Sequence, residues 1–273
     1  MKVSEIHYYP IKSCAGTPLT QARIGKYGIE HDRDFMITDE NAKFLTQREH
    51  AKMALIKPTR LQGEIKLEAP GMSALSIPIL QDGTHRVGQV WKHTVSVVDQ
   101  GDIVAEWLSA FLGTSVRLMG RAPDFARKLN PQYAPRETDT TAFADGYPLL
   151  IISEASLDDL NTRLIEKGAE PVPMNRFRPN LVVTDCAAFA EDALQPIRVG
   201  EVVFHAVKLC PRCPVPTIDQ VTAERGKEPI KTLNTYRRTA DGDVMFGNNL
   251  VHANEGVIRV GDETALLSGD LVP

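Results

Sequence analysis

Short runs of β-branched and other apolar residues recur along the whole chain, and this pattern constrains the fold more than any other feature. Such runs cover 94–98, 181–184, 202–209 and 256–260, and apolar and polar residues alternate over 65–69. They predict short strands, and the 19 glycines and 18 prolines spread along the chain predict turns between them. Because the strands do not alternate regularly with helices, we expect a mainly β, α+β architecture of barrel type rather than a doubly wound sheet.

Two short amphipathic helices are predicted between the strands. The first keeps one apolar face over 103–111 and ends before Gly113. The second begins after Ser156, with Asp159 in the capping-box position, and keeps leucines on one face over 157–164. We therefore expect few helices, each of them short.

The proline- and arginine-rich stretch 122–136 is the least regular part of the sequence. A domain boundary there gives a smaller β-rich N-terminal domain at 1–121 and a β-barrel domain at 122–273. Trp91 and Trp107 are predicted to lie in the core.

Charge and hydropathy exclude several classes of partner. Lys and Arg total 31 against 35 Asp and Glu, a net charge of -4, so nothing in the overall balance favours nucleic acid or an anionic membrane. The sequence shows neither an export signal nor the roughly 18 consecutive apolar residues of a membrane span. We expect a cytoplasmic protein, without a membrane or nucleic-acid partner, whose 4 cysteines stay reduced.

Cys210 and Cys213 have the C-x-x-C spacing, which by itself leaves several interpretations open. A zinc site needs two more ligands, and neither a second C-x-x-C nor a histidine pair at ligand spacing is present. A thioredoxin-like dithiol normally begins a helix, which the neighbouring prolines, among them Pro211, disfavour. Two buried structural cysteines are a further alternative. Lys208 and Arg212 indicate a positive surrounding that favours a thiolate for a soft metal.

Basic residues in turn-rich segments form a second group of candidates. They are Lys12, Arg33, Arg176, Arg178 and Arg212. Arginine matches phosphate oxygens with two parallel hydrogen bonds and lysine adds a point charge, and Ser13 can complete such a cradle. For each residue a surface salt bridge is the alternative, since spacing does not reveal whether the side chains converge.

Several segments, in this order, resemble the MOSC family, named for the C-terminal domain of molybdenum cofactor sulfurase, and most closely its amidoxime-reducing branch. The segments are Tyr9-Pro-Ile-Lys-Ser-Cys, Asp32-Arg-Asp-Phe-Met-Ile-Thr, Leu150-Ile-Ile-Ser-Glu-Ala-Ser, Phe177-Arg-Pro-Asn, Cys210-Pro-Arg-Cys and Phe246-Gly-Asn-Asn. The resemblance covers nearly the whole chain. It implies a barrel-like MOSC N-terminal domain at 1–121 and a MOSC domain at 122–273.

The resemblance also implies a site. Cys213 would be the molybdenum ligand beside the pterin dithiolene, with Cys210 in a supporting place. Positions that match cofactor contacts of the family are Lys12, Ser13, Arg33, Asp145, Gly146, Tyr147, Arg178, Asn180 and Arg212. Gly146 and Tyr147 stand where relatives can carry hydroxyl residues, and Pro211 removes a backbone donor just before Arg212.

The function implied by the resemblance is reduction of small N-hydroxylated compounds, such as amidoximes and hydroxylamines, to amidines or amines by oxygen-atom transfer at the molybdenum cofactor. Four cysteines leave none for an iron–sulfur cluster beside a molybdenum ligand, so we expect a separate electron-donor protein of ferredoxin, flavoprotein or cytochrome type. The alternatives are a carrier that delivers the cofactor or its sulfur without turnover, and a plain zinc or dithiol protein.

Overall fold

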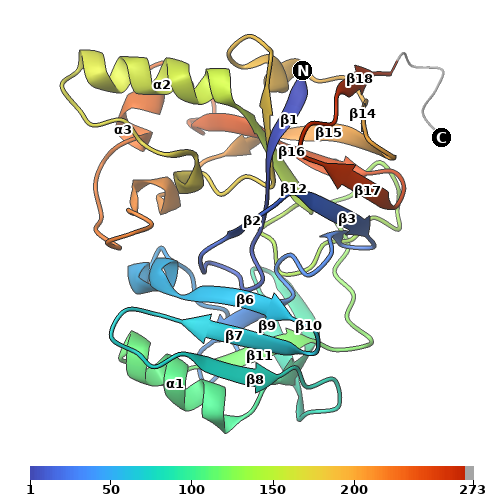
Figure 1. The fold of residues 1–273 in the computed structure, drawn as a ribbon, viewed down its shortest axis with the longest axis vertical. Coiled ribbons are helices and arrows are strands. Elements are labelled where there is room, and N and C mark those ends of the chain that lie inside the picture. Colours follow the sequence, from blue (N-terminus) through green and yellow to red (C-terminus); the bar gives the residue numbers. More distant parts are fainter. Residues whose placement is uncertain (268–273) are drawn as a thin grey trace.

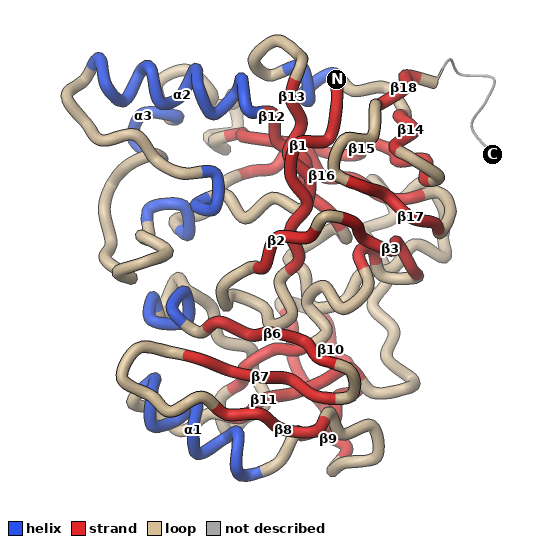
Figure 2. The backbone as a smooth tube through the Cα atoms, viewed as in Figure 1, coloured by secondary structure: helices blue, strands red, loops and turns tan. Residues whose placement is uncertain are grey.

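The computed structural model describes residues 1–267, in which strands predominate over helices (Figures 1 and 2). The α-helices are α1 (Asp102–Leu112), α2 (Glu154–Glu166) and α3 (Ile230–Leu233), and short 3-10 helices cover Ala51–Leu55, Met174–Arg176, Ala190–Ala193 and Val215–Thr217. The strands are β1 (Lys2–Tyr8), β2 (Thr17–Leu19), β3 (Gln21–Gly25), β4 (Gly28–Ile29), β5 (Phe35–Thr38), β6 (Lys57–Leu61), β7 (Glu64–Glu68), β8 (Leu75–Pro78), β9 (His85–Val90), β10 (His93–Asp99), β11 (Arg117–Arg121), β12 (Leu149–Ser153), β13 (Leu181–Thr184), β14 (Ile197–Val199), β15 (Val202–Pro211), β16 (Met245–His252), β17 (Gly256–Arg259) and β18 (Thr264–Leu266).

One lobe is built on a curled sheet with the order β18-β14-β15-β16-β12-β13-β1-β2. Strand β12 is buried along its whole length because both faces of this sheet are covered. Leu149 and Ile151 pack toward the small sheet β17-β3-β4, whereas Leu150 and Ile152 pack toward α2 and α3. This alternation places one core on each side of the sheet.

The other lobe packs two small sheets against α1, with the orders β5-β11-β10-β9 and β6-β7-β8 (Figure 1). Val104 and Leu108 of α1 lie in its core with Ile65 and Leu67 of β7, whose alternate residues point to solvent. The alternating pattern over 65–69 is therefore the pattern of a half-buried strand.

The mainly β fold class predicted from the sequence is confirmed, with 37% of residues in strands and 16% in helices. All five predicted strand segments occur, as β7, β10, β13, β15 and β17. Helix α1 ends at Gly113, whose φ of 74° is the left-handed conformation that glycine adopts without strain.

The predicted start of the second helix was wrong by three residues. The N-cap is Ser153, whose side chain accepts a hydrogen bond from the backbone N–H of Ser156. Ser156 is the third residue of α2, and its hydroxyl lies 2.7 Å from that of Ser153. Ser153 is the last residue of the apolar strand β12. In the sequence it therefore looks like part of a strand and not like the N-cap of a helix.

The first strands of the chain belong to the C-terminal sheets. Strand β1 pairs antiparallel with β13, and β3 pairs antiparallel with β17. The boundary placed between residues 121 and 122 stays a prediction, and the end of the second predicted domain, 268–273, lies outside the described residues. Within residues 1–267, no helix is long and apolar enough to cross a membrane.

Candidate functional site

A cavity of about 140 Å³ is lined by segments that lie far apart in the sequence. Cys213 and all the residues that the family resemblance matches to cofactor contacts line it: Lys12, Ser13, Arg33, Asp145, Gly146, Tyr147, Arg178, Asn180, Arg212 and Cys213. They come from the turn after β1, the turn before β5, the segment before β12, the turn before β13 and the loop after β15. The fold thus brings these residues together. Arg176, the other basic candidate, instead forms an ion pair with Asp219.

Lys12 lines the cavity and forms an ion pair with Asp145, and its ammonium also donates to the carbonyl of Phe143 at 2.9 Å. Burial lowers the pKa of Lys12 to about 8 although the Asp145 carboxylate acts against this. Desolvation raises the pKa of Asp145, but the Lys12 ammonium outweighs it and holds that pKa well below its usual value. The pair therefore carries both charges at neutral pH.

Tyr9 holds two of the arginines. The guanidinium groups of Arg33 and Arg178 lie 4.2 and 4.3 Å from the centroid of its ring. Its hydroxyl donates to the carbonyl of Pro179 at 3.0 Å, and burial raises the pKa of Tyr9 to about 12, so this hydroxyl stays protonated. Tyr9 was not among the predicted site residues, because nothing in the sequence shows that its ring lies beside two arginines far along the chain.

Arg33 is fixed by several polar contacts. It donates to the buried carboxylate of Asp32 at 2.5 Å and to the side-chain oxygen of Asn180 at 3.1 Å. The same amide group donates to the carbonyl of His7 and accepts from the N–H of Leu150. The side-chain amide of Asn180 therefore makes its hydrogen bonds to other residues of the protein. Its role at the cavity is to position Arg33.

Arg178 is the cation with the fewest contacts. Its side chain makes no hydrogen bond within residues 1–267, and burial lowers the pKa of its guanidinium. Ser13, Arg33 and Arg178 all have positive φ, at 65°, 51° and 58°. Such backbone strain in non-glycine residues is typical of functional sites.

The segment that carries Arg212 and Cys213 follows a strand pair with a β-bulge. The pairing of β15 with β16 shifts between Leu209 and Pro211, and the N–H of Arg212 then donates to the carbonyl of Val244. Cys210 and Cys213 are free thiols that both line the cavity. Bulges next to active sites re-aim side chains in this way.

The two cations expected to surround the thiols have specific partners. Arg212 donates to the sulfur of Cys210 at 3.1 Å and to the carbonyl of Phe177 at 2.7 Å, while its buried Nε has no partner in the described residues. Lys208 instead lies 4.5 Å from the centroid of the Tyr133 ring. Within residues 1–267, no three His, Cys, Asp or Glu side chains are grouped to hold a metal ion.

A mainly β protein whose cavity is lined by basic side chains and a thiol belongs to the class of proteins that can bind an anion together with a soft metal. The chain belongs to the MOSC family. Residues 1–115 match the MOSC N-terminal beta barrel domain and residues 138–265 match the MOSC domain.

Relatives in vertebrates align with nearly the whole chain. The chain is 33% identical to the mitochondrial amidoxime-reducing component 1 of Mus musculus, over 97% of this chain and 82% of the relative. It is 34% identical to the mitochondrial amidoxime reducing component 2 of Rattus norvegicus, over 95% of this chain and 81% of the relative.

Proposed function

We propose that the protein is a molybdenum-cofactor-dependent reductase of N-hydroxylated compounds. An amidoxime takes up two electrons and two protons, its N–O bond breaks, and an amidine and water are released. When bound, the cofactor supplies the redox centre that accepts the oxygen atom. The relatives named as amidoxime-reducing components support this activity.

The observation that carries the proposal is the convergence of the candidate residues on one cavity. Cys213 offers a single thiol, a soft ligand suited to molybdenum. The phosphate of a pterin cofactor fits the guanidinium of Arg178, because a half-buried cation without hydrogen bonds is stabilised when an anion accepts from it. The free Nε of Arg212 offers one more donor. The chemistry of these donors thus fits the cofactor.

The other residues of the site position these groups. Tyr9 stacks between Arg33 and Arg178, and Asn180 orients Arg33. The sulfur of Cys210 accepts a hydrogen bond from Arg212, which supports a positioning role for the first cysteine of the pair. Lys12 and Asp145 form an ion pair in the wall of the cavity.

A separate electron-donor protein is part of the proposal. Cys14 is fully buried in the core of the lobe that contains α1, and Cys186 packs at the edge of a core of the other lobe. With Cys213 assigned to the metal, the cysteines of this chain do not assemble a four-cysteine cluster.

The names of the relatives place those proteins in mitochondria, so a cytoplasmic location stays a prediction.

Substitution of Cys213 tests the proposal. Cys213→Ala, expressed in a host that makes the cofactor, should lose molybdenum and N-reductase activity measured with a chemical reductant. Cys186→Ala is the matched control and should retain both, and Cys210→Ala should retain molybdenum at a reduced level. Full activity of Cys213→Ala would contradict the assignment. Cofactor-loaded wild-type protein without turnover of any amidoxime would instead support the carrier function.

A further inference from the structure

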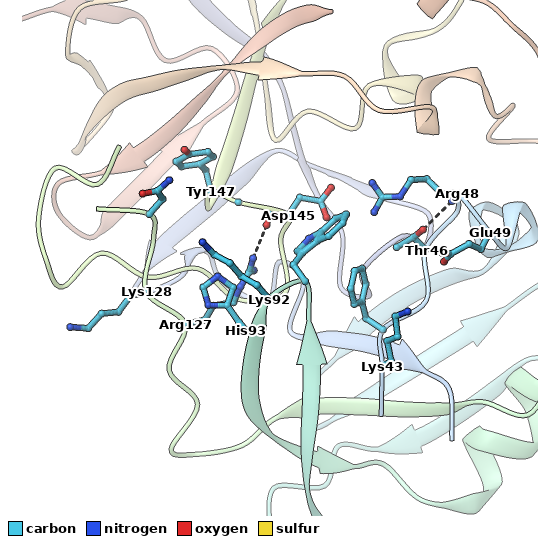
Figure 3. Close-up of a pocket in the computed structure, with 14 residues that line it drawn as sticks. Lys43, Thr46, Arg48, Glu49, Lys92, His93, Arg127, Lys128, Asp145 and Tyr147 are labelled. Carbon is cyan, nitrogen blue, oxygen red and sulfur yellow. Dashed lines mark hydrogen bonds between the residues drawn. The ribbon is translucent and has the colours of Figure 1, made fainter. Parts of the chain in front are cut away.

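A second and larger cavity, with a volume of about 680 Å³, opens beside the cavity that holds Cys213. Asp145, Gly146 and Tyr147 line both cavities. Figure 3 shows the larger one, with Arg48 on one side and Lys92 and Arg127 on the other. A ligand that fills the larger cavity therefore lies next to the proposed reaction site.

Unneutralised cations surround this cavity. They are Lys43, Arg48, Lys92, Arg127 and Lys128, and within residues 1–267 none of them forms an ion pair with a carboxylate. The carboxylates in the wall are Glu49 and Asp145, of which Asp145 is already paired with Lys12. The cavity thus has an excess of positive charge in a protein of net charge -4.

Arg127 is the buried member of this set, at 4% exposure. Its terminal nitrogens donate only to backbone carbonyls, those of Ala142, Ala144 and Asp145, and its Nε has no partner in the described residues. Burial lowers the pKa of Arg127 to about 10, which leaves the group charged at neutral pH. A buried charge of this kind attracts an anion.

Aromatic rings form another part of the wall, and one of them corrects a prediction. Trp91 was expected in the core, but it is 38% exposed and lies 5.0 Å from Phe44 between ring centroids. Val90 pairs with His93, so Trp91 is the first residue of a two-residue hairpin turn, with φ of 55°. This position favours glycine, and a tryptophan is held there against backbone strain.

The guanidinium of Arg48 lies over the exposed indole, 4.4 Å from its centroid. Its side chain makes no hydrogen bond in the described part of the chain, so its donors are free for a ligand. A flat ring and a cation side by side suit a planar molecule that carries a negative group.

We propose that this cavity binds the anionic aromatic end of the substrate, and that the preferred substrates are N-hydroxylated aryl compounds bearing a carboxylate or a similar anion. The inference rests on the proposed reductase function. It adds a substrate class and assigns Arg48, Trp91, Lys92, Arg127 and Lys128 to recognition.

The test uses cofactor-loaded protein, a chemical reductant in place of any donor protein, and probes that differ in charge. These are 4-carboxybenzamidoxime, benzamidoxime and 4-(aminomethyl)benzamidoxime. We expect the lowest KM for the carboxylate, about tenfold below that of the neutral probe, and the highest for the cation. The advantage of the carboxylate should shrink as the salt concentration rises. Equal KM values for all three probes would overturn the inference.

Substitutions in the cavity wall test which residues cause the preference for an anionic substrate. Lys92 and Lys128 are exposed, so Lys92→Gln with Lys128→Gln leaves the core intact, and the KM ratio between the neutral and carboxylate probes should fall toward one. Arg48→Gln should act in the same direction. Lys57→Gln removes an exposed charge elsewhere and is the matched control. An unchanged ratio in the lysine variant and in Arg48→Gln would contradict the assignment.

Binding without turnover separates this inference from the reductase proposal. Calorimetric titration of the loaded protein with 4-carboxybenzamidoxime, without reductant, should give a Kd that rises in the lysine variant. Charge-dependent binding without reduction would leave the anion site standing and refute the reductase. Reduction of all probes without charge preference would support the reductase and refute the anion site.

Discussion

The guanidinium of Arg178 lies 4.3 Å from the ring centroid of Tyr9 and has no hydrogen-bond partner within residues 1–267. Tyr9→Leu should release it, and Tyr9→Phe should keep the stacking while losing only the bond to Pro179. Since a cation–π contact is worth about 0.5–2 kcal/mol, we expect about two- to thirtyfold weaker cofactor binding in Tyr9→Leu. Molybdenum and pterin content after dialysis measures this. Equal losses in both variants would show that stacking is not the cause.

The stability contribution of Lys12 should depend on pH. In the folded protein its pKa is lowered to about 8 from 10.5, so the native state carries the cost of a buried charge below pH 8 and is relieved of it as pH rises toward 10.5. The free energy of unfolding of the wild type, measured relative to Lys12→Met, should therefore rise between pH 8 and pH 10. Urea unfolding at these pH values gives the difference. A falling difference would mean that the ion pair with Asp145 outweighs the burial.

Asn180 should matter for stability whether or not a cofactor is bound. Asn180→Ala removes hydrogen bonds to Arg33, His7 and Leu150 in a buried place, which should cost about 2–3 kcal/mol. Asn175→Ala, at an exposed position of the same segment, is the control and should stay within about 0.5 kcal/mol of the wild type. Chemical denaturation of both variants and the wild type gives these differences in the free energy of unfolding. A loss in Asn180→Ala no larger than that in Asn175→Ala would contradict the prediction.

Gly146 has room for a side chain, since a Cβ there meets nothing within 4 Å. Gly146→Ser should therefore keep the wild-type Tm, and the added hydroxyl in the wall of the cavity should raise retention of the proposed cofactor. Gly28→Ser is the contrast, because φ is 103° and the Cβ would lie 2.9 Å from Pro148. Loss of Tm in Gly146→Ser would show that the loop before β12 needs glycine for its own conformation.

Local features of the fold could be predicted from the sequence, and long-range ones could not. The runs of β-branched residues correctly predicted β13 and β15, because the preference for a strand depends on residues that are close together in the sequence. The types of the site residues were also predictable. Their convergence was not, since Lys12 and Cys213 meet only through the pairing of strands from opposite ends of the chain. Spacing along a sequence contains no information on that pairing.

The directions of single side chains also have local physical causes. Trp91 was assigned to the core because large apolar side chains are usually buried, but a two-residue turn places it in the wall of a cavity. Arg212 was expected to place a positive charge near the thiols of its loop, and its hydrogen bond goes to the sulfur of Cys210. The direction of the Trp91 side chain depends on a turn and that of Arg212 follows a bulge between Leu209 and Pro211, and no glycine or asparagine marks either feature in the sequence.

The pairing of β1 with β13 and of β3 with β17 sets an order of events during synthesis. At about 5–20 residues per second, the roughly 170 residues between β1 and β13 take on the order of 10–30 s to emerge from the ribosome. Throughout that interval β1 and β3 can pair only with the nearby strands β2 and β4, and the turns that carry Lys12 and Arg33 lack the rest of the cavity wall. The cavity comes into existence only once the last third of the chain has been made, so a cofactor can be inserted only into a nearly finished polypeptide.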